Sequence, residues 1–165
     1  MTDRVIVRPA RETDAEALAA MVNHLNVATG LPDGVHSAET VKRDAFGPTP
    51  LFEALIAEAD GRPVGYAYFQ SFYDSDRAGP GVLLLDLYVD DAARGRGAGR
   101  ALMAALARTA KTRGAVSMTW GVLDSNAGAI AFYERLGARD VQARIFEISA
   151  KALMRLADEG RIEID

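Results

Sequence analysis

The sequence of 165 residues contains no cysteine, two histidines and one tryptophan. Without cysteine the chain can form no disulfide, no thiolate metal site and no cysteine nucleophile, and we predict no metal site. No apolar run reaches the roughly eighteen residues of a membrane-spanning helix. The opening residues, Met1-Thr2-Asp3-Arg4, do not have the pattern of a secretory signal. We therefore expect a cytoplasmic protein that does not associate with a membrane.

Positive charge is also scarce. The chain has 19 Lys and Arg residues against 23 Asp and Glu, and its net charge is −4. Such a balance disfavours general binding to nucleic acid, which we do not expect as a partner. With 49% hydrophobic residues, a chain of this length can bury a sizeable core. We predict one globular domain spanning residues 1–165.

Alternating apolar residues and helical spacings indicate a mixed α/β organisation. Strands are predicted at 5–10, 52–59, 63–72, 83–89, 116–122 and 141–148, and Asp60-Gly61 is typical of a hairpin turn. Helices are predicted after Thr13 or Asp14 and at 38–44, 101–113, 124–136 and 149–156. Early hairpins followed by a β-α-β unit predict a mixed sheet flanked by helices.

The most informative stretch is 83–100, where an apolar strand leads into Arg94-Gly95-Arg96-Gly97-Ala98-Gly99-Arg100. We call residues 94–100 the glycine loop, and a helix is predicted to begin near its end. Glycines allow ligand oxygens to approach backbone N–H groups, and a helix N-terminus carries partial positive charge. Arginines add bidentate donors to this position. The stretch therefore predicts a site for phosphate groups.

Two other nucleotide motifs do not fit the glycine loop. A P-loop ends in Gly-Lys-Ser/Thr, which occurs nowhere in the chain. A dinucleotide fingerprint needs a third glycine where Arg100 stands, and an acid near Ala115 that is missing. A glycine-rich turn with solvated arginines is the structural alternative, and the motif alone does not decide between that turn and a phosphate site.

A second pattern lies at 120–137. Asn126 and Tyr133 are about two helical turns apart, so they share a helix face with Ala129 and Ile130. A face of small residues that ends in a phenol can hold a thin ligand arm. A phenol of pKa near ~10 can also protonate a thiolate of pKa near ~8.5. Alternatively, Tyr133 is a core aromatic and Asn126 is only a helix N-cap.

Together, R-x-x-G-x-G at 94–99 and Asn-x5-Phe-Tyr-x3-Gly at 126–137 resemble the acetyl-CoA half of the GNAT N-acetyltransferases. Further segments resemble the branch that acetylates diamines such as spermidine, spermine or thialysine: Val7-Arg8-Pro9-Ala10, Asp44-x-Phe46-Gly47-x-x-Pro50, Phe72-Tyr73-Asp74 and Arg144-Ile145-Phe146-Glu147-Ile148. The resemblance implies the α/β (α+β) GNAT fold. This fold has a mixed, mostly antiparallel sheet of about six to seven strands, with helices on both faces.

The resemblance also implies an acetyl-CoA-dependent acyltransferase that acts on a primary amine of a small molecule by direct attack in a ternary complex. Tyr133 corresponds to the general acid beside the sulfur. The positions that correspond to cofactor contacts are Leu87, Tyr88, Val89, Arg94, Gly95, Arg96, Gly97, Ala98, Gly99, Arg100, Asn126, Ala127, Gly128, Ala129 and Phe132.

One position departs from the family pattern. Polyamine-specific relatives carry a glutamate where this chain has Leu85, which leaves the general base unassigned. Asp86 is adjacent, but in a regular strand it points to the opposite face unless a bulge turns it back. Asp74 and Asp76, in the loop before the central strand, are the other candidate substrate-binding carboxylates together with Asp86.

Other interpretations stay open at this point. The acceptor can be an amino-acid, aminoglycoside or protein amine, or the chain can be a catalytically weak CoA-binding module. The last predicted helix carries Leu153 and Leu156 on one side, and related enzymes are commonly dimers. We therefore expect a homodimer.

Overall fold

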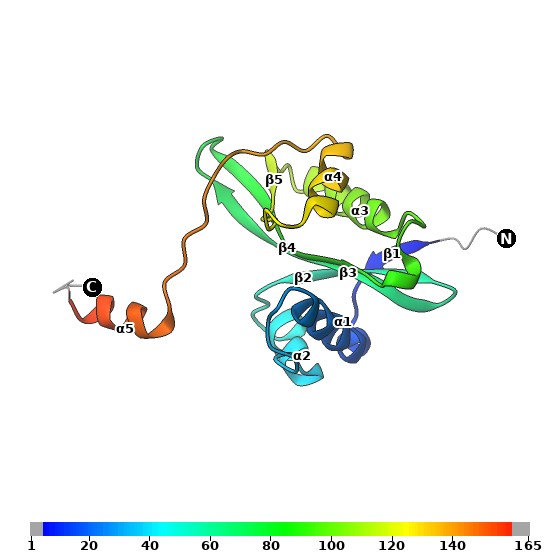
Figure 1. Cartoon of the computed structure of the whole chain (residues 1–165), viewed down its shortest axis with the longest axis horizontal. Helices are drawn as coiled ribbons and strands as arrows, with labels where there is room; N and C mark the ends of the chain where they lie inside the picture. Colours follow the sequence, from blue (N-terminus) through cyan, green and yellow to red (C-terminus); the bar gives the residue numbers. More distant parts are fainter. Residues whose placement is uncertain (1–4, 160–165) are drawn as a thin grey trace. The chain divides into compact units, whose positions relative to one another are not determined.

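The computed structural model describes residues 5–159. The chain separates into two compact units, Met1–Ser125 and Asn126–Asp165, and each is described by itself. The first unit contains, in chain order, β1 (Ile6–Pro9), α1 (Ala15–Ala28), α2 (Ala38–Phe46), β2 (Glu53–Ala59), β3 (Arg62–Asp74), β4 (Gly79–Val89), α3 (Ala98–Thr112) and β5 (Ser117–Thr119) (Figure 1). No helix within residues 5–159 is long and apolar enough to cross a membrane.

The sheet of the first unit has the strand order β1-β2-β3-β4-β5. All neighbouring strands are antiparallel except β4 and β5, which are parallel and connected through α3. The β2–β3 hairpin turns at Asp60 and Gly61, whose φ angles of 51° and 72° suit the tight turn that this dipeptide predicts. The predicted mixed, mostly antiparallel sheet is confirmed.

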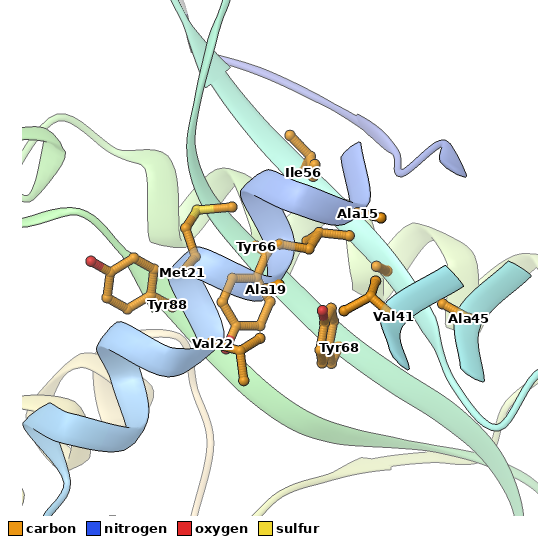
Figure 2. Close-up of a cluster of buried hydrophobic side chains, with 12 residues drawn as sticks. Ala15, Ala19, Met21, Val22, Val41, Ala45, Ile56, Tyr66, Tyr68 and Tyr88 are labelled. Carbon is orange, nitrogen blue, oxygen red and sulfur yellow. The ribbon is translucent and has the colours of Figure 1, made fainter. Parts of the chain in front are cut away.

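Helices cover both faces of this sheet (Figure 1). On one face, Leu18 and Val22 of α1 and Val41 of α2 are buried against Ile56 and Tyr66, as part of the cluster in Figure 2. On the other face lies α3, whose Leu102 and Leu106 are fully buried. The helical spacing of apolar residues in each helix therefore directs one face of it toward the sheet.

The second unit contains α4 (Ala127–Arg135) and α5 (Ala150–Asp158). Both helices begin with a capping side chain: Asn126 Oδ1 accepts from Ala129 N at 3.1 Å, and Ser149 Oγ accepts from Ala152 N at 3.3 Å. Gly137 follows α4 with a φ of 89°, a conformation that favours glycine after a helix. The sequence predicted both helices, although α4 begins two to three residues later than expected.

The strand predicted at 141–148 is wrong. Residues 138–149 form neither helix nor strand, so the sheet has five strands among the described residues rather than six to seven. Asp140 Oδ1 accepts from Gln142 N at 2.7 Å, and Gln142 has a φ of 55°, which interrupts extended backbone. Alternating apolar residues do not make a strand where the backbone has no neighbouring strand to pair with.

Apolar side chains of the second unit are exposed on this segment and on α5. Ile145 and Phe146 are 85% and 89% exposed, and Leu153 and Leu156 of α5 are more than half exposed. A homodimer could bury such exposed apolar side chains in its interface, and the homodimer stays a prediction.

Arg8 links three elements of the first unit. Its Nη1 and Nη2 donate to the two carboxylate oxygens of Asp14 at 2.7 and 2.9 Å, and its Nη2 and Nε donate to Glu58 at 2.6 and 3.0 Å. Arg8 lies on β1, Glu58 on β2 and Asp14 directly before α1. The hydrogen bonds from Arg8 hold the pKa of the Asp14 carboxyl below its usual value.

We predict that Arg8→Met lowers the free energy of unfolding by about 2–4 kcal/mol, because it leaves the buried Asp14 carboxylate without its cation. The control is Arg43→Met, which removes an exposed arginine from Asp44 and should leave the free energy of unfolding nearly unchanged. Because the pKa of Asp14 is lowered in the folded state, its contribution is complete above pH ~4 and is lost as the pH falls further. Urea unfolding of both variants at pH 7 and pH 3 measures this difference, and equal losses for the two variants at pH 7 would contradict it.

Candidate functional site

The glycine loop ends at the N-terminus of α3. Gly95 and Gly97 have φ angles of 76° and 87°, and a Cβ built on either residue would meet no atom within 4 Å. Gly97 is the N-cap of α3, no side chain caps the helix within the described residues, and its first turn contains no acid. The first N–H groups of α3 are therefore not satisfied by a side chain, an arrangement that suits an anion.

Arginines surround this helix end. Arg94 is partly engaged in shaping the loop, because its Nη1 pairs with Asp91 at 2.8 Å and its Nε donates to the Val89 carbonyl at 3.2 Å. Arg96 and Arg100 are exposed on the loop and on the first turn of α3. The loop therefore presents backbone donors and positive side chains on one exposed surface, the chemistry that a pyrophosphate requires.

The end of the strand that leads into the glycine loop is not paired with its parallel neighbour. β5 pairs with β4 only at Gly81, Val82 and Leu83. Farther along, β4 keeps its pairing with β3 up to Val89, but among the described residues it has no pairing with β5. The backbone groups of Leu87 to Val89 that point away from β3 are therefore not used by β5. An extended ligand can bind to such an edge by backbone hydrogen bonds.

An extra residue interrupts β4 before this separated end. Tyr68 of β3 pairs with Asp86, whereas the next residue, Phe69, pairs with Leu84, so Leu85 is a bulge. The bulge reverses the alternation of side chains in the rest of the strand. Asp86 consequently lies on the same face as Tyr68, the face covered by α1 and α2. This is the arrangement that the sequence left open for Asp86.

A polar cluster lies around Asp86 on this face. The rings of Tyr66 and Tyr68 are 4.6 Å apart and almost fully buried, and within the described part of the chain neither hydroxyl has a hydrogen-bond partner. Burial raises the pKa of the Asp86 carboxyl, while His36 and the nearby Tyr66 hydroxyl act in the opposite direction. The Tyr66 hydroxyl and the Asp86 carboxylate therefore interact, and this interaction lowers the pKa of Asp86 against the effect of burial. Figure 2 shows the two tyrosines beside side chains of α1 and α2.

Tyr88 has a different role from its neighbours. Its hydroxyl donates to Asp90 Oδ1 at 2.8 Å, and burial together with this carboxylate raises its pKa to about 12. Its ring packs against His24 of α1 with centroids 5.6 Å apart. Tyr88 therefore anchors the end of β4 to α1 through its side chain, while its backbone lies on the separated part of the strand.

The candidate carboxylates Asp74 and Asp76 lie at the far end of the β3–β4 hairpin. Asp74 is buried and accepts from Ser117 Oγ at 2.5 Å, from Arg77 Nη1 at 2.9 Å and from the N–H groups of Asp76 and Arg77 at 3.1 Å. The hydrogen bond from Ser117 and the pairing with Arg77 lower the pKa of Asp74. These contacts give Asp74 a structural role, because they connect the hairpin to β5. Asp76 is exposed.

Tyr133 and its neighbours lie together on α4, in the second unit. Tyr133 is partly buried, its ring is 5.3 Å from that of Phe132, and burial raises the pKa of its phenol. Asn126 is the N-cap of α4, as the structural alternative predicted, and the next two residues, Ala127 and Gly128, are exposed. The glycine loop with β4 and the Asn126–Tyr133 set therefore form two groups, each within its own unit.

The model of the acetyltransferase (GNAT) family matches residues 18–138. The chain belongs to this family. Thialysine N-epsilon-acetyltransferase from Sus scrofa is 33% identical over 166 residues, which cover 93% of this chain and 97% of the relative. L-ornithine N5-acetyltransferase NATA1 from Arabidopsis thaliana is 32% identical, over 61% of this chain and 41% of the relative.

The fold is likewise that of solved GNAT structures. Aminoglycoside N-acetyltransferase AAC(6′)-Iy in complex with CoA has a TM-score of 0.75 at 23% identity, over 91% of this chain and 97% of that one. The resemblance to the diamine acetyltransferase branch is confirmed by the thialysine enzymes. Family and relatives together support an acetyl-CoA-dependent N-acetyltransferase.

Sequence reasoning missed Tyr66, Tyr68 and His36. Tyr66 and Tyr68 occupy alternate positions of a predicted strand and therefore suggested ordinary core residues. The available signal was that a strand interior with two phenols needs hydrogen-bond partners for both hydroxyls. His36 belongs to the α1–α2 connection, where its backbone N–H and C=O bond to the Asn23 side chain at 3.0 and 2.8 Å.

We predict that Asp74→Asn lowers the melting temperature, because an amide cannot accept from all the donors that the Asp74 carboxylate satisfies. Asp76→Asn, two residues farther along and exposed, should leave the melting temperature nearly unchanged. Since the pKa of Asp74 is lowered in the folded state, the difference between the variants should shrink as the pH falls toward 3. Differential scanning calorimetry provides the comparison, and an equally stable Asp74→Asn protein would contradict the structural role.

Proposed function

We propose that this protein transfers the acetyl group of acetyl-CoA to a primary amine of a small molecule by direct attack in a ternary complex. The observation that carries the proposal is the uncapped, arginine-flanked N-terminus of α3, which follows a strand whose end is not paired with β5. This arrangement occurs in a chain that belongs to an acetyltransferase family.

The residues of the first unit fit the chemistry of acetyl-CoA. Gly95 and Gly97 leave open space where a side chain would stand, and Arg96 and Arg100 supply positive charge for a pyrophosphate. Leu87, Tyr88 and Val89 offer backbone groups for the acetyl carbonyl and the pantetheine arm. Acetyl-CoA itself supplies the activated thioester. In the second unit, the proposed contacts to the cofactor arm are Asn126, Ala127, Gly128, Ala129 and Phe132.

The acceptor is proposed to be a small molecule with a terminal primary amine. Thialysine and ornithine, the compounds in the names of two relatives, are both amino acids that carry such an amine at the end of the side chain. This likeness favours an amino-acid side-chain amine over a polyamine. Leu85, in place of the glutamate of polyamine-specific relatives, supports the same choice.

Tyr133 is the proposed general acid. Because burial raises its pKa, the phenol holds its proton at neutral pH and can donate it to the sulfur as the carbon–sulfur bond breaks. The attacking nitrogen forms the new carbon–nitrogen bond as the carbon–sulfur bond breaks, and CoA leaves as the thiol. Of the three protons of the ammonium form, one leaves to water before attack, one leaves as the amide forms, and the third stays on the amide nitrogen. Placing two bound reactants together can contribute about 7–11 kcal/mol, so the side chains need to supply only part of the rate enhancement.

We predict that saturating CoA raises the melting temperature of the protein and that Arg100→Glu removes most of this rise, because it puts a negative charge among the phosphates. Arg108→Glu is the matched control. Arg108 is exposed on the same helix but two turns farther from the N-terminus, so the same change of charge there should keep the rise. Thermal shift with CoA measures all three proteins, and a native protein that CoA does not stabilise would overturn the cofactor assignment.

We predict that Tyr133→Phe lowers turnover by about 10²–10⁴-fold while the affinity for CoA changes little, because the hydroxyl acts only in the transition state. Tyr73→Phe serves as the control, since Tyr73 is 68% exposed and lies near the C-terminal end of β3. Steady-state kinetics with CoA titration give both quantities. If Tyr133 is instead only a packing residue, turnover stays near normal and only stability falls, by about 0.5–1.5 kcal/mol.

A further inference from the structure

The face of the sheet beneath α1 and α2 holds two buried hydroxyls that the cofactor assignment does not use. Tyr66 is 0% and Tyr68 3% exposed, and neither phenol oxygen has a partner among the described residues. Buried polar atoms without a partner are rare in folded proteins. Here two such hydroxyls belong to rings whose centroids are only 4.6 Å apart, which indicates a binding position for a polar group.

A carboxylate faces the same position. The bulge at Leu85 sets Asp86 directly opposite Tyr68, and Tyr66 follows two pairs farther along, opposite Tyr88. Asp86 is partly exposed, whereas both tyrosines are buried, so a ligand from solvent meets the carboxylate first. No lysine or arginine within residues 5–159 forms an ion pair with it.

Few other titratable groups face this cluster. His36 from the α1–α2 connection acts on Asp86 electrostatically, and His24 of α1 contacts the ring of Tyr88. Tyr88 is already committed to Asp90 through its hydroxyl. Asp86 is therefore a partly buried carboxylate that lacks a cation of its own, beside two hydroxyls that lack partners. A partly buried carboxylate gains most from a cation that also satisfies the surrounding polar atoms.

We infer that the Asp86 carboxylate and the hydroxyls of Tyr66 and Tyr68 bind one primary ammonium group of the acceptor. An ammonium group has three N–H donors, and this cluster offers three acceptor groups. The faces of the tyrosine rings add a favourable electrostatic environment for a cation. The inference rests on the proposed function, because it assigns the amine-binding part of the same active site.

The inference also defines the class of acceptor. One carboxylate balances one positive charge, and the hydroxyls discriminate by the number of N–H donors. The subsite thus favours a primary ammonium over a quaternary one, which has no donor. Leu85 provides no second carboxylate for the inner charges of a polyamine. An acceptor with a single charged amine near the reacting end fits these groups best.

The test uses the full chain and three probes that share a four-carbon chain with a terminal hydroxyl: 4-amino-1-butanol, 1,4-butanediol and (4-hydroxybutyl)trimethylammonium. NMR titration gives the dissociation constant of each. The expected result is saturable binding of 4-amino-1-butanol and binding at least about tenfold weaker for the other two. Asp86→Asn should weaken binding of the amine by about tenfold or more, and Tyr66→Phe and Tyr68→Phe by about threefold to tenfold each. Tyr73→Phe should leave it unchanged.

Melting temperatures of the same variants separate binding from structure. Removal of an unpartnered hydroxyl should leave the melting temperature unchanged or raise it, so weaker binding with intact stability supports the subsite. Unchanged binding in Tyr66→Phe and Tyr68→Phe would overturn it, and so would equal binding of the amine and the diol. If Asp86→Asn fails to fold, the two tyrosine variants still decide. If CoA does not raise the melting temperature of the native protein, the proposed function is refuted instead. The amine titration contains no CoA, so its result is independent of that outcome.

Discussion

The structure depends most on one extra residue in a central strand. Leu85 bulges from β4, so Asp86 and Tyr88 lie on the α1/α2 face, whereas regular alternation would direct them toward α3. Pairing with β5 ends at Leu83, just before this bulge, and the strand continues to the glycine loop with β3 alone. The edge proposed for the cofactor and the polar cluster proposed for the amine thus both belong to the part of β4 that follows this single irregularity.

Local sequence chemistry predicted much of this arrangement. Asp60-Gly61 predicted its hairpin because both residues adopt positive φ at low cost, and Ser37 and Ser149 predicted helix starts because their side chains accept from the first turn. The glycine loop predicted the start of α3. The strand at 141–148 failed because apolar alternation says nothing about a pairing partner, and a turn at Asp140 and Gln142 intervenes.

The sequence predicted the parts of the candidate site that belong to a motif. It did not predict the parts that depend on contacts between distant segments. R-x-x-G-x-G and Asn-x5-Phe-Tyr-x3-Gly identified the family that the comparisons show. The side chain of Asp86 could not be assigned to a face, because a bulge depends on how β3 and β4 pair rather than on either strand alone. Asp74 resembled a loop acid, but its hydrogen bonds to Ser117 and Arg77 come from residues that only the folded hairpin and β5 bring together.

The central claim is transfer of an acetyl group to a small primary amine, and release of free CoA thiol from acetyl-CoA tests it most directly. The assay compares thialysine, L-ornithine and 4-amino-1-butanol with spermidine, an aminoglycoside and a peptide amine. We expect thiol release that depends on the amine, and faster release with the single-amine side chains of thialysine and ornithine than with spermidine. Release no faster than acetyl-CoA hydrolysis with every amine, from a protein that CoA nevertheless stabilises, would contradict the account and indicate a CoA-binding module.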